Sequence, residues 1–217
     1  MTSITNGYTT LKDLKRYLGI DIDGSDTVDD GDLNRIVNVV SRAIEHTTGT
    51  KFYAATETRY YNPTMSNRLN IDNCLSITTI KEDTSGDGVF DTTWAATDYQ
   101  LRPRNAATGT PAEPYKWVST LPNGARVFPT WWDDYDPVQI VGSFGYNSGT
   151  STSAPDQIKQ ACLMGCGLMF EVQKTNLGVG GGDFSGTIEA RRQIIANTAV
   201  MDLLNSVEMR DPVMLVT

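Results

Sequence analysis

The six positions from Asp83 to Gly88 have the residue types that begin a calcium-binding loop. Asp83, Ser85 and Asp87 offer oxygen ligands at positions 1, 3 and 5, and Gly88 follows at position 6. Such a loop also needs a bidentate glutamate at position 12. That position is Trp94, and the segment lies between predicted strands. These features favour a polar hairpin turn, with weak cation binding as the alternative.

Two cysteines and one histidine are the other candidates for metal or nucleophilic chemistry. Cys162 and Cys166 are spaced to share one face of a helix, but a zinc site usually has four ligands. Only His46 and Cys74 could complete it, and no spacing brings them together. Any catalytic triad would depend on His46, which lies late in a predicted helix where a cation complements the dipole. We therefore expect core thiols, no metal, no cofactor and no enzyme activity.

Two further clusters have binding and structural interpretations. Trp131 and Trp132 precede the acids of 133–136, as in a sugar platform or a glycosidase pair. Glycosidase carboxylates face each other across a bond, which adjacent positions do not achieve. An exposed strand end or an interface patch is the favoured interpretation. The glycine-rich segment 178–182 lacks the Lys-Ser or Lys-Thr of a phosphate loop, and we interpret it as a flexible loop.

The elements that would position these residues begin with two helices of matching apolar spacing. The intervals 3, 1, 3, 3 and 1 separate the apolar residues in both segments. At about 100° per residue, such spacing gives one buried stripe. We expect the two stripes to face each other although they lie far apart in the chain. The first contains Leu33, Ile36, Val37, Val40, Ala43 and Ile44, and the second contains Ile158, Ala161, Cys162, Gly165, Leu168 and Met169, extended by Val172.

The middle of the chain has the alternation and the β-branched residues of strands. A five- or six-stranded antiparallel sheet is expected. Its predicted strands are 57–61, 68–71, 76–80, 98–101, 115–118 and 138–141. A capping box at Thr10 predicts a short first helix that ends at Gly19.

The last helix is predicted from Ser185 to Leu204. Its apolar residues point in several directions, so we expect partners on more than one side, including another subunit. The fold class is therefore α+β, with a helical unit from both chain ends and an inserted antiparallel β domain. The predicted parts are 1–52, 53–146, 147–205 and an extended tail 206–217.

Composition excludes several classes of protein. The chain has 217 residues and a net charge of −8, which argues against a general nucleic-acid binder. No apolar run approaches the roughly 20 residues that span a bilayer, so we expect no membrane association. The first seven residues lack the pattern of a secretory signal, and three cysteines suggest free thiols in a reducing compartment.

The order of several phrases resembles the head–tail connector proteins, or head-completion adaptors, of long-tailed bacteriophages. The similarity covers most of residues 8–205. The phrases are 8–20, 43–52, 75–80, 98–103, 141–146 and 155–161.

The resemblance implies a structural virion protein: an adaptor ring, usually a dodecamer, beneath the portal at the head–tail interface. Its expected partners are the portal protein, neighbouring copies and the next connector or tail-completion protein. DNA would pass through the channel without sequence-specific binding. The protein would be made in the host cytoplasm and reside in the virion. The longer β region departs from the smallest members, which leaves open the neighbour that it contacts.

Two sets of residues are candidates for these roles. An apolar tip at the end of the chain would dock on the portal or on a neighbouring copy. A set of acids would line the channel, and the alternative interpretation of these acids is a solvated loop. The tip is Val213, Met214, Leu215 and Val216, and the acids are Asp21, Asp23, Asp26, Asp29, Asp30 and Asp32. The alternative function is a carbohydrate-binding β module with a weak cation site, and a hydrolase using 133–136 is a further alternative.

Overall fold

The computed structural model describes residues 3–20, 27, 29–106, 113–122, 124, 126–130, 134–146, 154–176 and 186–208. The chain divides into two compact units, one formed by residues 1–52 with 150–217 and the other by 53–149. Five helices and one six-stranded antiparallel sheet lie in the described residues, so the mixed α+β class is confirmed. None of the described helices combines the length and the apolar character needed to cross a bilayer.

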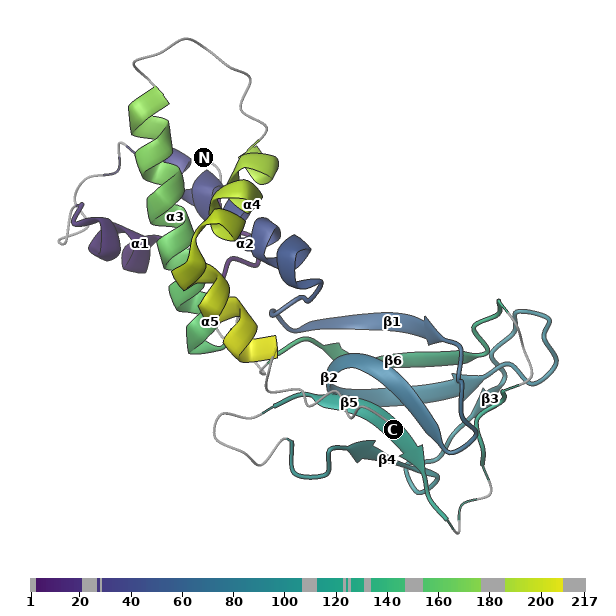
Figure 1. The fold of residues 1–217 in the computed structure, drawn as a ribbon. Helices are drawn as coiled ribbons and strands as arrows, with labels where there is room; N and C mark the ends of the chain where they lie inside the picture. The colour runs from purple at the N-terminus through teal and green to yellow at the C-terminus, as the bar shows by residue number, and fades with distance from the viewer. Residues whose placement is uncertain are drawn as a thin grey trace. The chain divides into compact units, whose positions relative to one another are not determined.

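The first unit contains all the described helices (Figure 1). Helix α1 (Leu11–Leu18) is capped by Thr10, whose hydroxyl accepts a hydrogen bond from the Asp13 amide, and it ends at Gly19 with a φ of 68°. Helix α2 (Asp30–Thr48) ends at Gly49 with a φ of 67°. A left-handed residue at this position favours glycine, so the predicted end of the first helix at Gly19 is confirmed.

Helix α3 (Asp156–Asn176) contacts each of the other four helices of this unit. The predicted stripe of α2 is fully buried, and Ile158, Ala161, Cys162 and Met169 of α3 are also buried. Helix α3 approaches its neighbours closely at two glycines. A Cβ on Gly165 would lie 2.9 Å from Val40 Cγ1, and one on Gly167 would lie 3.0 Å from the Tyr17 ring. Small residues therefore set the spacing of α3 from α2 and α1.

The single last helix predicted from the sequence is wrong, because two helices occupy its place. Helix α4 (Gly186–Ala196) ends before Asn197, and α5 (Thr198–Glu208) begins after it. The Asn197 Oδ1 accepts a hydrogen bond from the Val200 amide at 3.1 Å, which caps the new helix. The break explains the scattered apolar residues, since each helix has its own buried side. Helix α5 also extends through Glu208, three residues beyond residue 205, where the predicted helical part ends.

The second unit is a sheet with strand order β1-β6-β2-β5-β4, and β3 pairs with β2. The strands are β1 (Ala55–Tyr61), β2 (Arg68–Glu82), β3 (Thr92–Thr93), β4 (Tyr99–Arg102), β5 (Tyr115–Thr120) and β6 (Val138–Phe144). Two strands predicted at 68–71 and 76–80 are one strand, β2. Its register shifts between Asn70 and Cys74 and again on its β6 side, so bulges interrupt the alternation that the prediction used.

The core of the β unit lies on one face of these strands. β6 alternates strictly, with Val138, Ile140 and Phe144 buried. Trp94 and Phe128 stack in this core with ring centroids 4.7 Å apart. The Trp94 indole also donates to Glu82 Oε2 at 3.1 Å, which supplies the buried indole with a polar partner.

Candidate functional site

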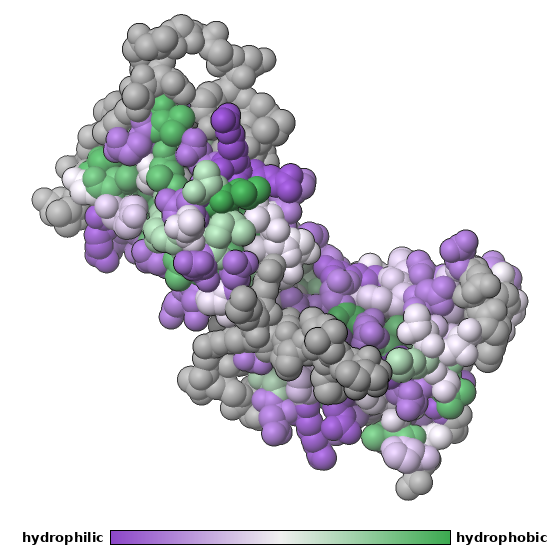
Figure 2. Space-filling view, in the orientation of Figure 1, coloured by the Kyte–Doolittle hydropathy of each residue, from purple (hydrophilic) through white to green (hydrophobic). Residues whose placement is uncertain are grey.

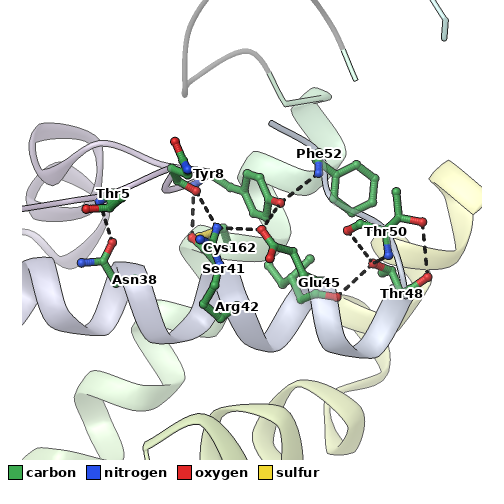
Figure 3. A network of polar contacts seen from close by, with 12 residues as sticks. Thr5, Tyr8, Asn38, Ser41, Arg42, Glu45, Thr48, Thr50, Phe52 and Cys162 are labelled. Atoms are coloured by element: carbon green, nitrogen blue, oxygen red, sulfur yellow. Dashed lines mark hydrogen bonds and ion pairs between the residues drawn. The ribbon is translucent and has the colours of Figure 1, made fainter. Parts of the chain in front are cut away.

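The helical unit contains a buried polar network centred on Tyr8 (Figure 3). The Tyr8 side chain is fully buried, and its hydroxyl donates to Glu45 Oε1 at 2.5 Å while accepting from the Phe52 amide at 2.9 Å. The Tyr8 amide donates to Ser41 Oγ at 3.1 Å. Burial first, and then the Glu45 carboxylate, raise the pKa of Tyr8 above its usual range. The phenol is therefore neutral and has a structural role.

The same network fastens the N-terminal segment along α2. Asn38 bonds this segment twice, accepting from the Thr5 amide at 2.8 Å and donating to the Ser3 carbonyl at 2.9 Å. Arg42 Nη2 donates to the Asn6 carbonyl at 2.7 Å and pairs with Glu45 at 2.6 Å. The sequence analysis missed this network, because the partners of Tyr8 lie 33 to 44 positions away.

The cysteines and the histidine do not form a reactive site in the described residues. Cys162 and Cys166 are fully buried with their sulfurs 4.0 Å apart, and Cys162 Sγ lies 3.7 Å from Ser41 Oγ. Burial raises the pKa of Cys166 and raises that of Cys74 to about 11, so neither thiol is activated. His46 lies on α2 in the first unit, whereas Cys74 belongs to the second. Within the described ranges, no three His, Cys, Asp or Glu side chains could hold a metal ion together.

The calcium-like segment forms the β2–β3 hairpin turn, as the favoured interpretation predicted. The Asp83 carboxylate is buried and accepts from the amides of Ser85 at 3.0 Å, Gly86 at 2.7 Å and Gly88 at 2.7 Å. It also accepts from the Tyr135 hydroxyl. These donors, the Tyr135 hydroxyl foremost, lower the pKa of Asp83, and the same bond raises the pKa of Tyr135. The carboxylate binds donors of its own chain in place of a cation.

The aromatic and acidic cluster lies only partly within the described residues. Trp131, Trp132 and Asp133 fall outside them, as does the glycine-rich segment 178–182. Asp134 and Asp136 are exposed, and Asp134 has a left-handed φ of 55°. Tyr135 between them points to Asp83. The described part of this cluster is therefore a surface turn that is anchored by a tyrosine.

The candidate channel acids are distributed over different environments. Asp21, Asp23 and Asp26 lie outside the described residues, as do Val213, Met214, Leu215 and Val216 of the tail. Asp29 is exposed and precedes α2. Asp30 pairs with Lys15 at 2.5 Å, and Asp32 pairs with Arg35 at 3.4 Å. Their role in a channel stays a prediction.

Much of the apolar surface of the last helices is covered within the chain. Helix α4 contacts α2 and α3, and α5 contacts α3. Ala190, Ile194, Val200, Leu204 and Val207 are buried there. Ile195 of α4 stays 50% exposed, so a contact of the last helices with another subunit stays a prediction. On the side of the molecule that Figure 2 shows, apolar residues lie among polar ones in both units.

A second set of polar residues, missed by the sequence analysis, lies on the β unit. The register of β4, β5 and β2 aligns Arg102 with Trp117 and Asn70, and aligns Gln100 with Ser119 and Arg68. The row between them, Leu101, Val118 and Leu69, belongs to the core. Because neighbouring residues of a strand point to opposite faces, the two outer rows share the face away from the core. We call Arg68, Asn70, Gln100, Arg102, Trp117 and Ser119 the arginine–tryptophan face.

Comparison with known proteins gives a likeness of fold. No family model matches the chain, and no curated protein matches it in sequence. Five chains of solved structures match it in fold. One belongs to a structure described as "Neck of empty GTA particle computed with C6 symmetry", with a TM-score of 0.57 and 13% sequence identity. The match covers 95% of this chain and 92% of the other, so the shared fold extends over both units.

Proposed function

We propose that this chain is a structural protein of a phage-like virion, a head–tail adaptor that forms a ring beneath the portal. The observation that carries the proposal is the fold shared over nearly the full length with a chain from the neck of a GTA particle, a structure computed with C6 symmetry. At 13% sequence identity the similarity between the two chains concerns the fold alone. The adaptor role is our inference from that shared fold. The resemblance of the sequence phrases to head–tail connectors points to the same role independently.

A role without catalysis agrees with the chemistry of the described residues. Burial raises the pKa of Tyr8, Cys74 and Cys166, and Asp83 is saturated by donors. We propose that the helical unit, built from both chain ends, mediates ring closure, and that the ring extends the DNA channel from head to tail. Acids from Asp21 to Asp32 would line this channel, because like charges prevent DNA from binding tightly.

The direct test adds purified protein to portal-bearing heads that lack it. Electron microscopy should show a new ring at the portal vertex, and the completed heads should then join tails. Heads that retain DNA and join tails equally well without the protein would refute the proposal.

The docking role of the tail has its own test. Helix α5 extends to Glu208, so a chain truncated after that residue keeps the described helices intact. We expect it to attach to heads at least about tenfold less well. The matched control replaces 209–217 by a Gly-Ser segment of equal length, which should fail equally if the apolar residues matter. Undiminished attachment of both variants would exclude the docking role.

The alternative from the sequence was a carbohydrate-binding β module with a cation site. Asp83 would be the first ligand of that cation site. Its carboxylate instead accepts hydrogen bonds from three amides and a tyrosine, which weakens this alternative. A glycan array with and without calcium tests what is left of this alternative.

A further inference from the structure

The arginine–tryptophan face is rich in hydrogen-bond donors and has no carboxylate among its six residues, although the chain carries 26 acids against 18 basic residues. The Arg68 guanidinium lies 4.5 Å from the centroid of the Trp117 ring, and its Nε donates to Asn70 Oδ1 at 2.9 Å. Arg102 lies directly across from Trp117 on the other side, in β4. Asn70 and Trp117 thus hold Arg68 in one orientation, and the two arginines come from the strands on either side of Trp117.

The two arginines of this face differ from the third arginine of the sheet. Arg59, on β1, is neutralised by Glu57 at 2.8 Å and Asp72 at 2.7 Å and lies over the Phe144 ring. Over the part of the chain that the structure describes, neither Arg68 nor Arg102 has an ion pair with a carboxylate. A guanidinium offers five donors in a planar fork that binds carboxylates in a bidentate manner. The face is therefore suited to an acidic partner.

The same β unit carries acids that lack a cationic partner. Asp87 and Asp91 lie in the β2–β3 turn, and Asp134 and Asp136 lie before β6; all four are exposed. Among the described residues, none of the four forms an ion pair. Asp83 connects the two segments, since it accepts from three amides of the turn and from the hydroxyl of Tyr135. We call Asp87, Asp91, Asp134 and Asp136 the acidic loops.

We propose that the arginine–tryptophan face binds the acidic loops of a second copy of this chain. A head-to-tail interface, which generates rings, needs two different and complementary patches on one molecule. The β unit has both, and tryptophan and arginine are the residues most enriched at the energetic centres of interfaces. This inference rests on the proposed ring and names the surfaces of the β unit that join neighbouring copies.

Nucleic acid fits this face less well. Electrostatic affinity for DNA grows with the number of phosphates that a protein neutralises. The face offers two cations within a chain of net charge −8. A protein partner needs only a few carboxylates at matching positions, and the acidic loops supply four.

The test reverses the charge on each surface separately. One variant is Arg68→Glu with Arg102→Glu, and the other replaces all four residues of the acidic loops by lysine: Asp87→Lys, Asp91→Lys, Asp134→Lys and Asp136→Lys. Each variant alone should form rings on portal-bearing heads at least about tenfold less often than the wild type, because like charges then meet at the interface. An equimolar mixture should recover to within about threefold, since every contact in an alternating ring is again between unlike charges. A single chain carrying all six substitutions should recover as well.

Three observations would overturn the proposal. The arginine variant could form rings as well as the wild type does. The mixture could fail to recover although both variants are folded by circular dichroism. The matched control, Lys12→Glu with Arg16→Glu on the exposed side of α1, could be impaired equally and could recover equally when it is mixed with the aspartate variant, which would assign both effects to net charge alone.

A measurement without heads separates this inference from the proposed function. Sedimentation at high protein concentration should show self-association of the wild type, its loss in each variant and its return in the mixture. Self-association with this pattern, without attachment to heads, would refute the adaptor role and support the interface. No self-association of the wild type in either assay would refute the interface. Duplex DNA binding that Arg68→Glu with Arg102→Glu abolishes would assign the face to nucleic acid and would also refute it.

Discussion

The two units of this protein are stabilised in different ways. The β unit is one continuous segment, 53–149, whereas the helical unit joins residues 1–52 to 150–217. In the β unit the tight contacts involve the backbone, as at Gly142, where a Cβ would lie 2.4 Å from the Ser76 carbonyl oxygen. In the helical unit they involve side chains, as at Gly165 beside Val40. The β unit should therefore tolerate less change at its closest contacts.

The largest expected effect is that of Gly142→Ala in β6. The new methyl group would meet the backbone of β2, which cannot move without breaking the sheet, so we expect a loss of about 3 kcal/mol or more. The matched variant Gly165→Ala meets a side-chain atom, Val40 Cγ1, and alanine also favours a helix by about 1 kcal/mol. We expect its net cost to be below about 1 kcal/mol.

Two signals distinguish the units in this experiment. All four tryptophans, Trp94, Trp117, Trp131 and Trp132, belong to the β unit, so tryptophan fluorescence monitors the unfolding of that unit. Far-UV circular dichroism is dominated by the helices. Equal costs for Gly142→Ala and Gly165→Ala would remove the difference that we draw between the two units.

The second effect is that of Asp83→Asn, which replaces the buried carboxylate of the β2–β3 turn. Its donors lower the pKa of Asp83 below the ordinary value of 3.8. The resulting stabilisation is present above about pH 4 and is lost as the pH falls through the pKa of the folded state. We expect Asp83→Asn to lower the fluorescence-detected urea midpoint at pH 7. It should also weaken the decline of that midpoint below pH 4, and an unchanged decline would contradict this role of Asp83.

The third effect is that of Tyr8→Phe in the helical unit. The variant leaves the Phe52 amide and Glu45 without the phenol oxygen, at a cost of about 2 kcal/mol. Because burial raises the pKa of Tyr8 above its ordinary value of 10.0, its contribution is complete below pH 10 and is lost as the pH rises further. The circular dichroism midpoint should therefore be lower in Tyr8→Phe and less sensitive to alkaline pH. A shift confined to tryptophan fluorescence would contradict the assignment to the helical unit.

The smallest effect is that of Asn197→Ala, which removes the cap of α5. Loss of such a cap costs about 1 kcal/mol. The control Asn197→Ser keeps a capping oxygen and should stay close to the wild type in thermal unfolding. Equal midpoints for the alanine and serine variants would show that the hydrogen bond to Val200 contributes nothing.

The helices were the most predictable part of the fold, because their buried faces repeat locally. The stripe from Leu33 to Ile44 is buried as predicted, and the first helix ends at Gly19 as predicted. The break at Asn197 was missed, although an asparagine before Thr198 is a helix-start signal that could have indicated it. The bulges interrupt the alternation of β2, and for this reason two strands were predicted in its place.

The sites were less predictable than the fold, because their residues meet only through long-range pairing. Arg68, Arg102 and Trp117 come from three strands, and only the register places them together. Tyr8 gave no signal in the sequence, since a buried hydroxyl is recognised by its partners rather than by its neighbours. The favoured turn at Asp83 was predicted correctly because its donors are local amides.

The contact between Ser41 and Cys162 joins residues 121 positions apart. A ribosome adding about 5–20 residues per second needs roughly ten seconds to synthesise that stretch. During this time the apolar side of α2 has been made while α3 has not, whereas the intervening β unit can already close upon itself. The nascent chain thus exposes the apolar side of α2 until synthesis nears its end. A chaperone that binds exposed apolar segments would act on this chain during that interval.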